Sequence, residues 1–200
     1  MSEEALNRHQ RAAITKRKRT RAWILDAARS LFDEHGYHAV TRDDIAAKAG
    51  VGAATIHKHF STKQTVAVAA YAPYVLGLMQ ATEKSLANGV QIDWVITEFI
   101  RELALELHDH PTMAYALLPL AQGQRTLTHS GNSEEVLDVS FQQLTELLGK
   151  LLERQACHDR SGILVVEVAD FYLSGLLTWI VQHPERSDED AAALLLSQLL

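Results

Sequence analysis

Residues 41–60 constrain the fold more than any other stretch of this chain. Thr41 is followed three residues later by Asp44, a pair typical of a capped helix start, because the hydroxyl accepts from amides that the first turn leaves unpaired. Gly50 then suits the positive φ of a tight turn. A second short helix follows, with Ile56 as its apolar anchor. The spacing therefore predicts two short helices joined by a turn, a helix-turn-helix.

An amphipathic helix is expected just before this motif, over residues 21–35. Its apolar residues recur at helical spacing, at Ile24, Ala27, Ala28, Leu31 and Phe32. Gly36 is expected to end it. The three helices predict one small domain whose core is formed by Ile24, Leu31, Phe32, Ile45, Val51, Ile56 and Phe60.

These residues resemble the TetR-type (tetracycline-repressor-like) regulators. The resemblance runs from Ile24-Leu25-Asp26-Ala27-Ala28 through Leu31-Phe32-Asp33-Glu34-His35-Gly36-Tyr37 and Thr41-Arg42-Asp43-Asp44-Ile45-Ala46 to Phe60-Ser61-Thr62-Lys63, about a quarter of the chain. It implies an all-α fold of about nine helices. A three-helix helix-turn-helix domain that binds DNA would be followed by a helical domain for ligand binding and dimerisation.

The expected organisation is a flexible basic arm over residues 1–20, the helix-turn-helix domain over 21–63 and the C-terminal domain over 64–200. The charge distribution agrees with this division. Residues 1–63 hold 12 Lys and Arg against 7 Asp and Glu, and residues 64–200 hold 7 against 18. A basic end suits a polyanion such as DNA. The run Lys16–Arg19 is either a solvated tail or an accessory contact to phosphates or the minor groove.

The resemblance also implies which residues contact double-stranded DNA: Arg21, Thr41, Arg42, Ala53, Ala54, Thr55, His57, Lys58, His59 and Lys63. The family usually has a small hydroxyl residue and a lysine where this chain has Gly52 and Ala53, and tyrosines at His57 and His59. Base contacts therefore do not transfer in detail. Because histidine gains charge near neutrality, DNA binding that depends on pH is one hypothesis.

A long helix is expected directly after Phe60, begun by a capping box of Ser61 and Gln64. In the family this helix links the two domains. Lys63 in its first turn opposes the helix dipole, which favours a phosphate partner over a role in helix stability. Pro73 is expected to kink the helix. The kink is either a hinge or a static bend.

Further helices are expected over residues 91–108, 112–121, 133–155, 161–183 and 187–200, with a loop at 122–132 and a cap at Ser187 or Asp188. The helix over 161–183 is apolar around most of its circumference, and Glu167 and Asp170 interrupt it too often for a membrane span. With the last helix it has surplus apolar surface. That surplus indicates a homodimer seam, placed at Val165, Tyr172, Leu176, Ile180, Leu195 and Leu199.

The resemblance implies a small apolar or amphipathic effector, of unknown identity, in the C-terminal domain. The candidate pocket residues are Phe99, Leu103, Met113, Tyr115, Leu117, Phe141, Leu144, Phe171, Gly175 and Trp179. Large apolar residues on helices usually fill their own core, so plain packing is the alternative for all of them.

The resulting prediction is a cytoplasmic, ligand-responsive repressor with no enzymatic activity, metal or cofactor. Cys157 is the one cysteine and forms no internal disulfide. His108 and His110 are assigned to a polar turn before Pro111 rather than to a metal site. Two rivals stay open: an enzyme, which only the histidines and carboxylates suggest, and a ligand- or partner-binding protein whose helix-turn-helix no longer reads a sequence.

Overall fold

The computed structural model describes residues 3–121, 135–155 and 163–199 of the chain. Within these ranges it contains nine α-helices and no β-strand, so the all-α prediction is confirmed. The helices are α1 (Glu3–Ala39), α2 (Arg42–Lys48), α3 (Ala53–His59), α4 (Lys63–Ala87), α5 (Ile92–Asp109), α6 (Pro111–Ala121), α7 (Glu135–Gln155), α8 (Ile163–Gln182) and α9 (Asp188–Leu199). The loop predicted at 122–132 lies outside the described residues.

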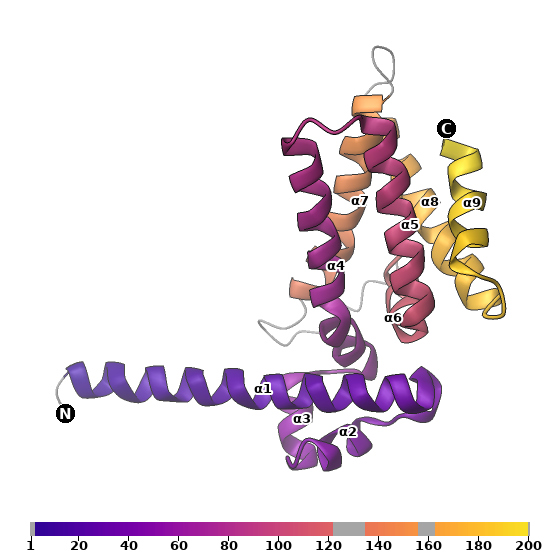
Figure 1. Cartoon of the computed structure of the whole chain (residues 1–200). Helices are drawn as coiled ribbons and strands as arrows, with labels where there is room; N and C mark the ends of the chain where they lie inside the picture. The colour runs from indigo at the N-terminus through magenta and orange to yellow at the C-terminus, as the bar shows by residue number, and fades with distance from the viewer. Residues whose placement is uncertain (1–2, 122–134, 156–162, 200) are drawn as a thin grey trace.

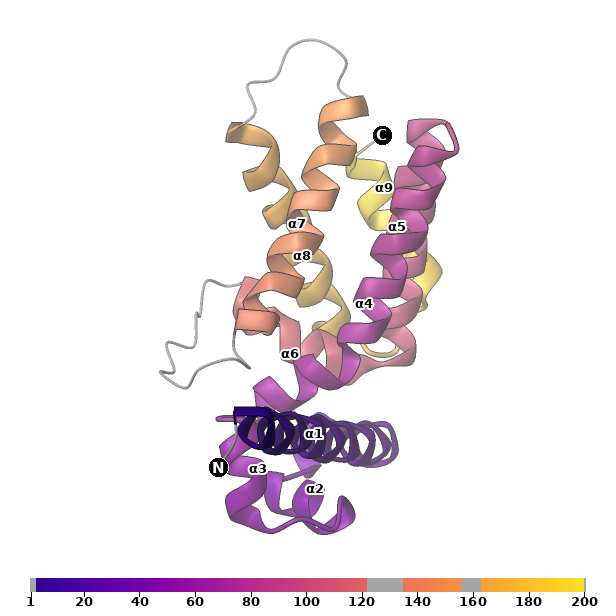
Figure 2. The ribbon, with the colours of Figure 1, turned by 90° about the vertical axis from the view of Figure 1, so that its left-hand side faces the viewer.

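The helices form two layers (Figure 1). Helix α1 runs across the base with α2 and α3 beneath it, and α4 rises from this base into a bundle with α5–α9. Figure 2 shows α1 nearly end-on below the bundle, with α6 reaching down towards it. Helices α4 and α6 are both packed on α1, so they join the small domain to the bundle.

The N-terminal segment differs from the prediction. A flexible arm was expected over residues 1–20, but the chain is helical from Glu3 and continues without interruption into α1. Alanine, arginine, lysine and glutamate have high helix propensity, and no glycine or proline occurs before Gly36. Gly36 does break the helical geometry where predicted, with φ 76° and ψ 165°.

The small domain has the predicted core. Five of the predicted residues are almost completely buried: Ile24, Phe32, Ile45, Ile56 and Phe60. The other two, Leu31 and Val51, are partly buried and pack against this cluster. The apolar side chains of α1 and α2 therefore pack against the buried side of α3 and hold this helix in position.

Helix α4 begins one residue later than predicted. Its N-cap is Thr62, whose hydroxyl accepts from the Thr65 amide at 3.0 Å, while the Thr65 hydroxyl accepts from the Thr62 amide at 3.1 Å. The expected capping box of Ser61 and Gln64 is wrong, because the helix start moves the third position to Thr65. The helix continues through Pro73, whose ring is exposed.

Helix α4 is also the one described helix whose length and composition would allow it to cross a membrane. Every residue from Thr65 to Ala72 is buried within the protein, and α4 packs against α1, α5, α6 and α7. Its apolar character is therefore that of a core helix.

The bundle is closed by α8 and α9. Ala169, Leu173, Leu176 and Leu177 of α8 are buried and lie on one face of the helix, whereas Phe171 is 74% exposed. The predicted cover on more than one side is therefore not seen within the protomer and stays a prediction. The Ser187 hydroxyl accepts from the Asp190 amide at 3.1 Å, so Ser187 caps α9. The sharp connection at 183–187 brings the end of α8 close to α5 and α6.

Candidate nucleic-acid interface and ligand cavity

The turn between α2 and α3 is held by backbone and capping bonds. The Thr41 amide donates to the Asp44 carboxylate at 2.8 Å, and the Asp44 amide donates back to the Thr41 hydroxyl at 3.2 Å. Hydrogen bonds from the Thr41 side chain and amide lower the pKa of Asp44. Gly50 has φ 66°, as predicted for the turn. The predicted helix start and turn are both confirmed.

Helix α3 has one buried and one exposed side. Ile56 is completely buried in the core, whereas Ala53, Ala54, His57 and Lys58 are exposed and Thr55 is half-buried. Gly52 is the N-cap and makes no side-chain capping bond. The exposed side is small and polar, which permits close approach of the helix to a groove.

His59 is not on the exposed side where it was expected. Its side chain is only 7% exposed and its ring centroid lies 6.4 Å from that of Phe60. It follows Ile56 by three residues, so helical periodicity turns it towards the core. Burial lowers its pKa, and the nearby cations of Arg17 and Arg21, together with Lys58, lower it further. The prediction that His59 contacts DNA from an exposed position is therefore wrong.

Arg42, predicted to contact DNA, and Lys63, predicted to contact phosphate, donate to main-chain carbonyls. Arg42 Nη1 donates to the carbonyls of Phe60, at 3.3 Å, and of Ser61. Lys63 Nζ donates to the Tyr37 carbonyl at 2.8 Å and lies 4.4 Å from the centroid of the Tyr37 ring. Burial lowers the pKa of Lys63. These two cations fasten the segments that flank α2 and α3.

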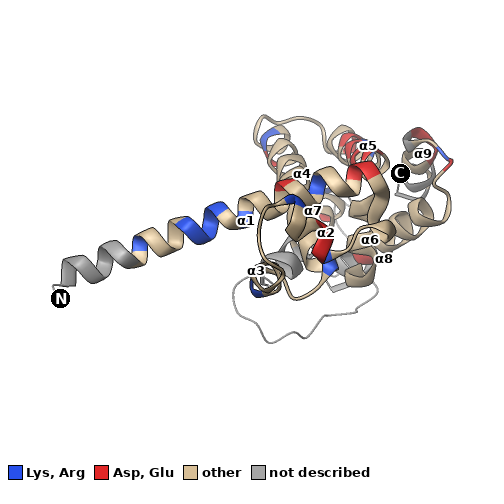
Figure 3. Cartoon of the chain, turned by 90° about the horizontal axis from the view of Figure 1, so that it is seen from below, with Lys and Arg blue, Asp and Glu red and all other residues tan. Residues whose placement is uncertain are grey.

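Positive charge gathers where α1 passes α3. The Arg21 guanidinium lies 4.3 Å from the centroid of the Phe60 ring, and burial followed by the charge of Arg17 lowers the pKa of Arg21. With Lys58 these cations surround His59. Figure 3 shows the Lys and Arg residues spread along α1 as it projects past α3, and the acidic residues over α2, α5 and α9. We call Arg17, Arg21, Lys58 and the exposed side of α3 the basic surface.

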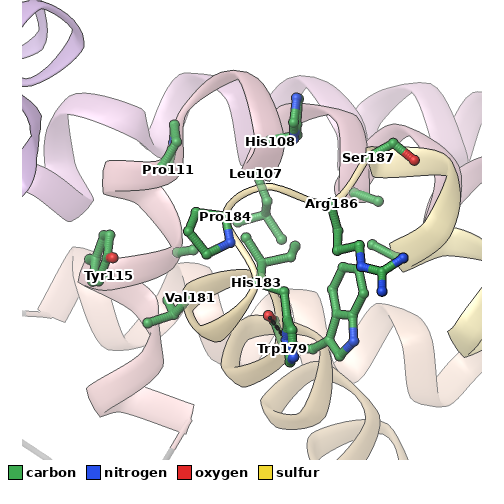
Figure 4. Close-up of a pocket in the computed structure, with 14 residues that line it drawn as sticks. Leu107, His108, Pro111, Tyr115, Trp179, Val181, His183, Pro184, Arg186 and Ser187 are labelled. Atoms are coloured by element: carbon green, nitrogen blue, oxygen red, sulfur yellow. Dashed lines mark hydrogen bonds between the residues drawn. The ribbon is translucent and has the colours of Figure 1, made fainter.

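A cavity of about 70 Å³ lies between the end of α5, α6, the end of α8 and the start of α9 (Figure 4). Two predicted pocket residues line it, Tyr115 and Trp179. Five others, Phe99, Leu103, Met113, Leu117 and Leu144, are buried and belong to the core. Phe171, 74% exposed, and Gly175 face outwards. The Phe141 side chain lies outside those the structure describes.

Sequence reasoning found Trp179 on α8 but missed the part of this cavity that the α8–α9 connection supplies. His183, Pro184 and Arg186 line it, and the His183 ring stacks on Trp179 at 5.2 Å. The four-residue spacing of Trp179 and His183 before a proline was the available signal. A second hollow, an open groove of about 460 Å³ between α4 and α7, is rimmed by charges of both signs. It is a poorer fit for an apolar ligand.

The predicted dimer residues have different environments within the protomer. Leu176 is only 2% exposed and packs in the core, because α8 lies against α6 and α7. Its assignment to an intersubunit surface is therefore wrong. Tyr172 and Ile180 are partly buried. The side chains of Val165, Leu195 and Leu199 lie outside those described.

Residues 24–70 match the sequence model described as bacterial regulatory proteins, tetR family. The N-terminal domain is of the tetR type. The chain is also similar to the HTH-type transcriptional activator FasR of Mycolicibacterium smegmatis. The two are 34% identical over 70 residues, which is 35% of this chain and 32% of FasR.

Solved structures extend the likeness of fold beyond the tetR-type domain. FadR of Thermus thermophilus, a TetR-family transcriptional repressor solved with lauroyl-CoA, superposes with a TM-score of 0.67 at 22% identity, over 90% of this chain and 92% of that one. FadR of Bacillus subtilis, solved with stearoyl-CoA, gives 0.60 at 15% identity, over 89% and 96%. The bundle of this chain therefore has the same fold as the C-terminal domains of those regulators.

Proposed function

We propose that this chain is a ligand-responsive transcriptional regulator that binds a palindromic operator as a homodimer. The observation that carries the proposal is the basic surface, where cations of α1 border the exposed side of a short helix whose other side is buried. Its tetR-type domain and the activities named for similar proteins, FasR and FadR, support the same function.

The residues divide into two roles on DNA. Lys58 and Arg17 supply charge to phosphates, and Ala53, Ala54 and Thr55 allow the start of α3 to approach base edges. Arg42 and Lys63 act mainly as positioning residues, since each donates to main-chain carbonyls. Two copies of α3 about one helical turn apart would read a palindrome, which is the reason to propose a dimer and a cytoplasmic location with the DNA.

The direction of control is proposed as repression that an effector relieves. The similar FadR of Thermus thermophilus is a repressor and was solved with an acyl-CoA, so an amphipathic effector is the natural class to test. FasR is named an activator, so transcription itself must be measured. Deleting the gene should raise expression of the regulated promoter, and lowered expression would instead assign activation.

The test of DNA reading is selection of a binding site from random duplexes, followed by titration across a salt series. We expect a palindrome bound about a thousandfold or more tightly than unrelated DNA, with log affinity falling linearly in log salt. Equal weak binding to all sequences would favour the rival, a helical ligand-binding protein whose helix-turn-helix no longer reads DNA.

Two lysine variants test whether DNA binding depends on the basic surface or only on the total charge of the protein. Lys58→Ala should weaken operator binding about tenfold or more and reduce the salt slope by about two, because one phosphate contact is lost in each protomer of the dimer. Lys84→Ala removes an exposed lysine from the far end of α4 and should leave both unchanged. Equal effects of the two variants would contradict the assignment of the basic surface.

A further inference from the structure

Tyr115 touches both the cavity and the tetR-type domain. One side of its ring lines the cavity. The ring also lies parallel to that of Tyr37, with centroids 6.1 Å apart and 5° between planes, and meets the edge of His38 at 4.8 Å. Tyr37 and His38 belong to the end of α1, immediately before the helix-turn-helix. The Tyr115 side chain is therefore in contact with both the cavity and the tetR-type domain.

Helix α6 is the wall of the cavity on this side. In Figure 4, Pro111 and Tyr115 on α6 lie at one side of the pocket and Trp179, His183 and Arg186 at the other, with Val181 and Pro184 between them. The same helix is fastened to the start of α4, because Gln64 Nε2 donates to the Ala116 carbonyl at 3.0 Å. A group that enlarges the cavity by displacing α6 therefore moves a helix that is hydrogen-bonded to α4 and packed on α1.

The lining combines an apolar floor with one cation at the rim. Leu107, Ala114, Ile180 and Ala191 supply the floor, and the exposed Arg186 supplies guanidinium donors. The His183 Nδ1 donates to the Trp179 carbonyl at 3.0 Å. None of the described residues that line it is an aspartate or glutamate. An acidic head group beside Arg186 with an apolar tail towards Leu107 matches this arrangement.

The cavity is small for such a tail. Its volume of about 70 Å³ compares with about 150 Å³ for a protein cavity that holds benzene. A short alkyl chain fills it. A longer chain fits only if the wall moves, and Tyr115 is the part of the wall in contact with the tetR-type domain.

We propose that this cavity binds small amphipathic carboxylates, and that Tyr115 transmits occupancy to the DNA-binding domain once the alkyl chain exceeds the cavity. The proposal rests on the proposed regulatory function and adds the class of ligand and the residue that reports it. Chains that only fill the cavity bind without changing DNA affinity, and longer chains displace the Tyr115 ring and weaken DNA binding.

Binding is measured with Trp179 as the reporter. The other tryptophans, Trp23 and Trp94, are 49% and 54% exposed and are replaced by phenylalanine, so that fluorescence comes from the cavity alone. Butanoate, hexanoate, octanoate and dodecanoate are titrated as probes, with octylamine as the opposite charge. Affinity should rise about threefold to fourfold for each methylene until the cavity is full.

Two cavity variants test the location and the charge preference. Val181→Trp, made with Trp179→Phe so that the added indole is the reporter, fills the space and should reduce octanoate affinity at least tenfold. Arg186→Gln should weaken octanoate about tenfold and leave octanol unchanged. Melting temperatures establish that each variant is folded. Octylamine binding as tightly as octanoate, or octanoate binding undiminished in both variants, would overturn the proposal.

The reporting role is tested by the effect of dodecanoate on operator affinity. Tyr115→Leu removes the contact with Tyr37 and should lose most of the effect of dodecanoate on DNA, with dodecanoate affinity measured in parallel because Tyr115 lines the cavity. Tyr115→Phe keeps the ring and should retain the effect. Tyr37→Leu, which removes the other half of the stack, should behave like Tyr115→Leu. An undiminished effect in both leucine variants would exclude Tyr115 as the reporter.

The two proposals fail in different ways. A chain that selects an operator but binds none of the carboxylates keeps its regulatory function and loses this ligand assignment. A chain that binds carboxylates at Trp179 but selects no operator loses the regulatory function.

Discussion

The tetR-type domain and the C-terminal bundle both have a packed apolar core, but they differ in the polar bonds around it. In the tetR-type domain, long polar side chains close the structure by donating to carbonyls far along the chain, as Arg42 and Lys63 do. The bundle depends on packed leucine, alanine and phenylalanine, and contains the cavity beside Trp179. Under the proposed function, the surface that matches DNA is held by directional hydrogen bonds. The cavity proposed to accept a flexible tail is bordered by van der Waals contacts, which have no preferred direction.

The largest expected effect comes from the core of the tetR-type domain. Phe60→Ala should destabilise the protein by about 3–5 kcal/mol, because Phe60 is 1% exposed and the side chains of this small core cannot rearrange to fill the space that the lost ring leaves. Urea unfolding measures the change. Trp94→Ala, at a side chain that is 54% exposed, is the control and should cost far less. Similar losses for the two would contradict the buried packing of Phe60.

The next effect concerns the junction of the two regions. Tyr71 on α4 is completely buried and its hydroxyl donates to Asp33 Oδ1 on α1 at 2.7 Å. Burial, with the neighbouring Asp33 carboxylate, raises the pKa of Tyr71, so the hydroxyl keeps its proton at physiological pH. Tyr71→Phe should cost about 1 kcal/mol in urea unfolding. Tyr74→Phe, on a half-buried neighbour, is the comparison, and an equal loss there would argue against this bond.

A third prediction uses pH to probe the buried His59. Its folded pKa is lowered from the usual value of 6.5, first by burial and then by Arg17, Arg21 and Lys58. The unfolded chain therefore binds more protons in this range, so stability falls as pH drops below about 6.5 and levels off below the folded pKa. Urea midpoints at several pH values should show this loss, and His59→Gln should remove the contribution. An unchanged pH slope in the variant would contradict it.

The smallest expected effect sharpens the contrast between α2 and α3. The cap of α2 is a full capping box, whereas Gly52 caps α3 with no side-chain bond. Gly52→Ser should stabilise the protein by a few tenths of a kcal/mol, since its φ of −72° suits serine and no atom lies within 4 Å of an added Cβ. Thermal unfolding should show a small rise. Gly50→Ser, at φ 66°, should lower the melting temperature.

Much of the fold could be predicted from local patterns. The capping box of Thr41 with Asp44 and the backbone conformations of Gly36 and Gly50 depend on only a few neighbouring residues, so they can be predicted from the sequence. Periodicity likewise located the helices of the bundle. The run over residues 3–20 was misread because it lacks an apolar stripe, although its residues favour helix.

The candidate sites were less predictable because they depend on contacts distant in sequence. Lys63 meets the Tyr37 carbonyl across 26 residues, and no local pattern distinguishes that bond from a contact to phosphate. His59 and Lys58 are neighbours, yet tertiary packing buries only the first. The cavity needs the turn after α8 to meet the end of α5, which periodicity does not specify.

No linker separates the tetR-type domain from α4, and this limits where the C-terminal bundle could be replaced by that of another regulator. Thr62 caps α4 only two residues after Phe60, and Tyr71, nine residues further on, still belongs to the packing of α1. A hybrid regulator joined at residue 63 would give α1 a foreign neighbour along the first turns of α4. Exchange of effector domains between such regulators should therefore require a junction beyond Tyr74 and a donor α6 that keeps the contacts with Tyr37 and His38.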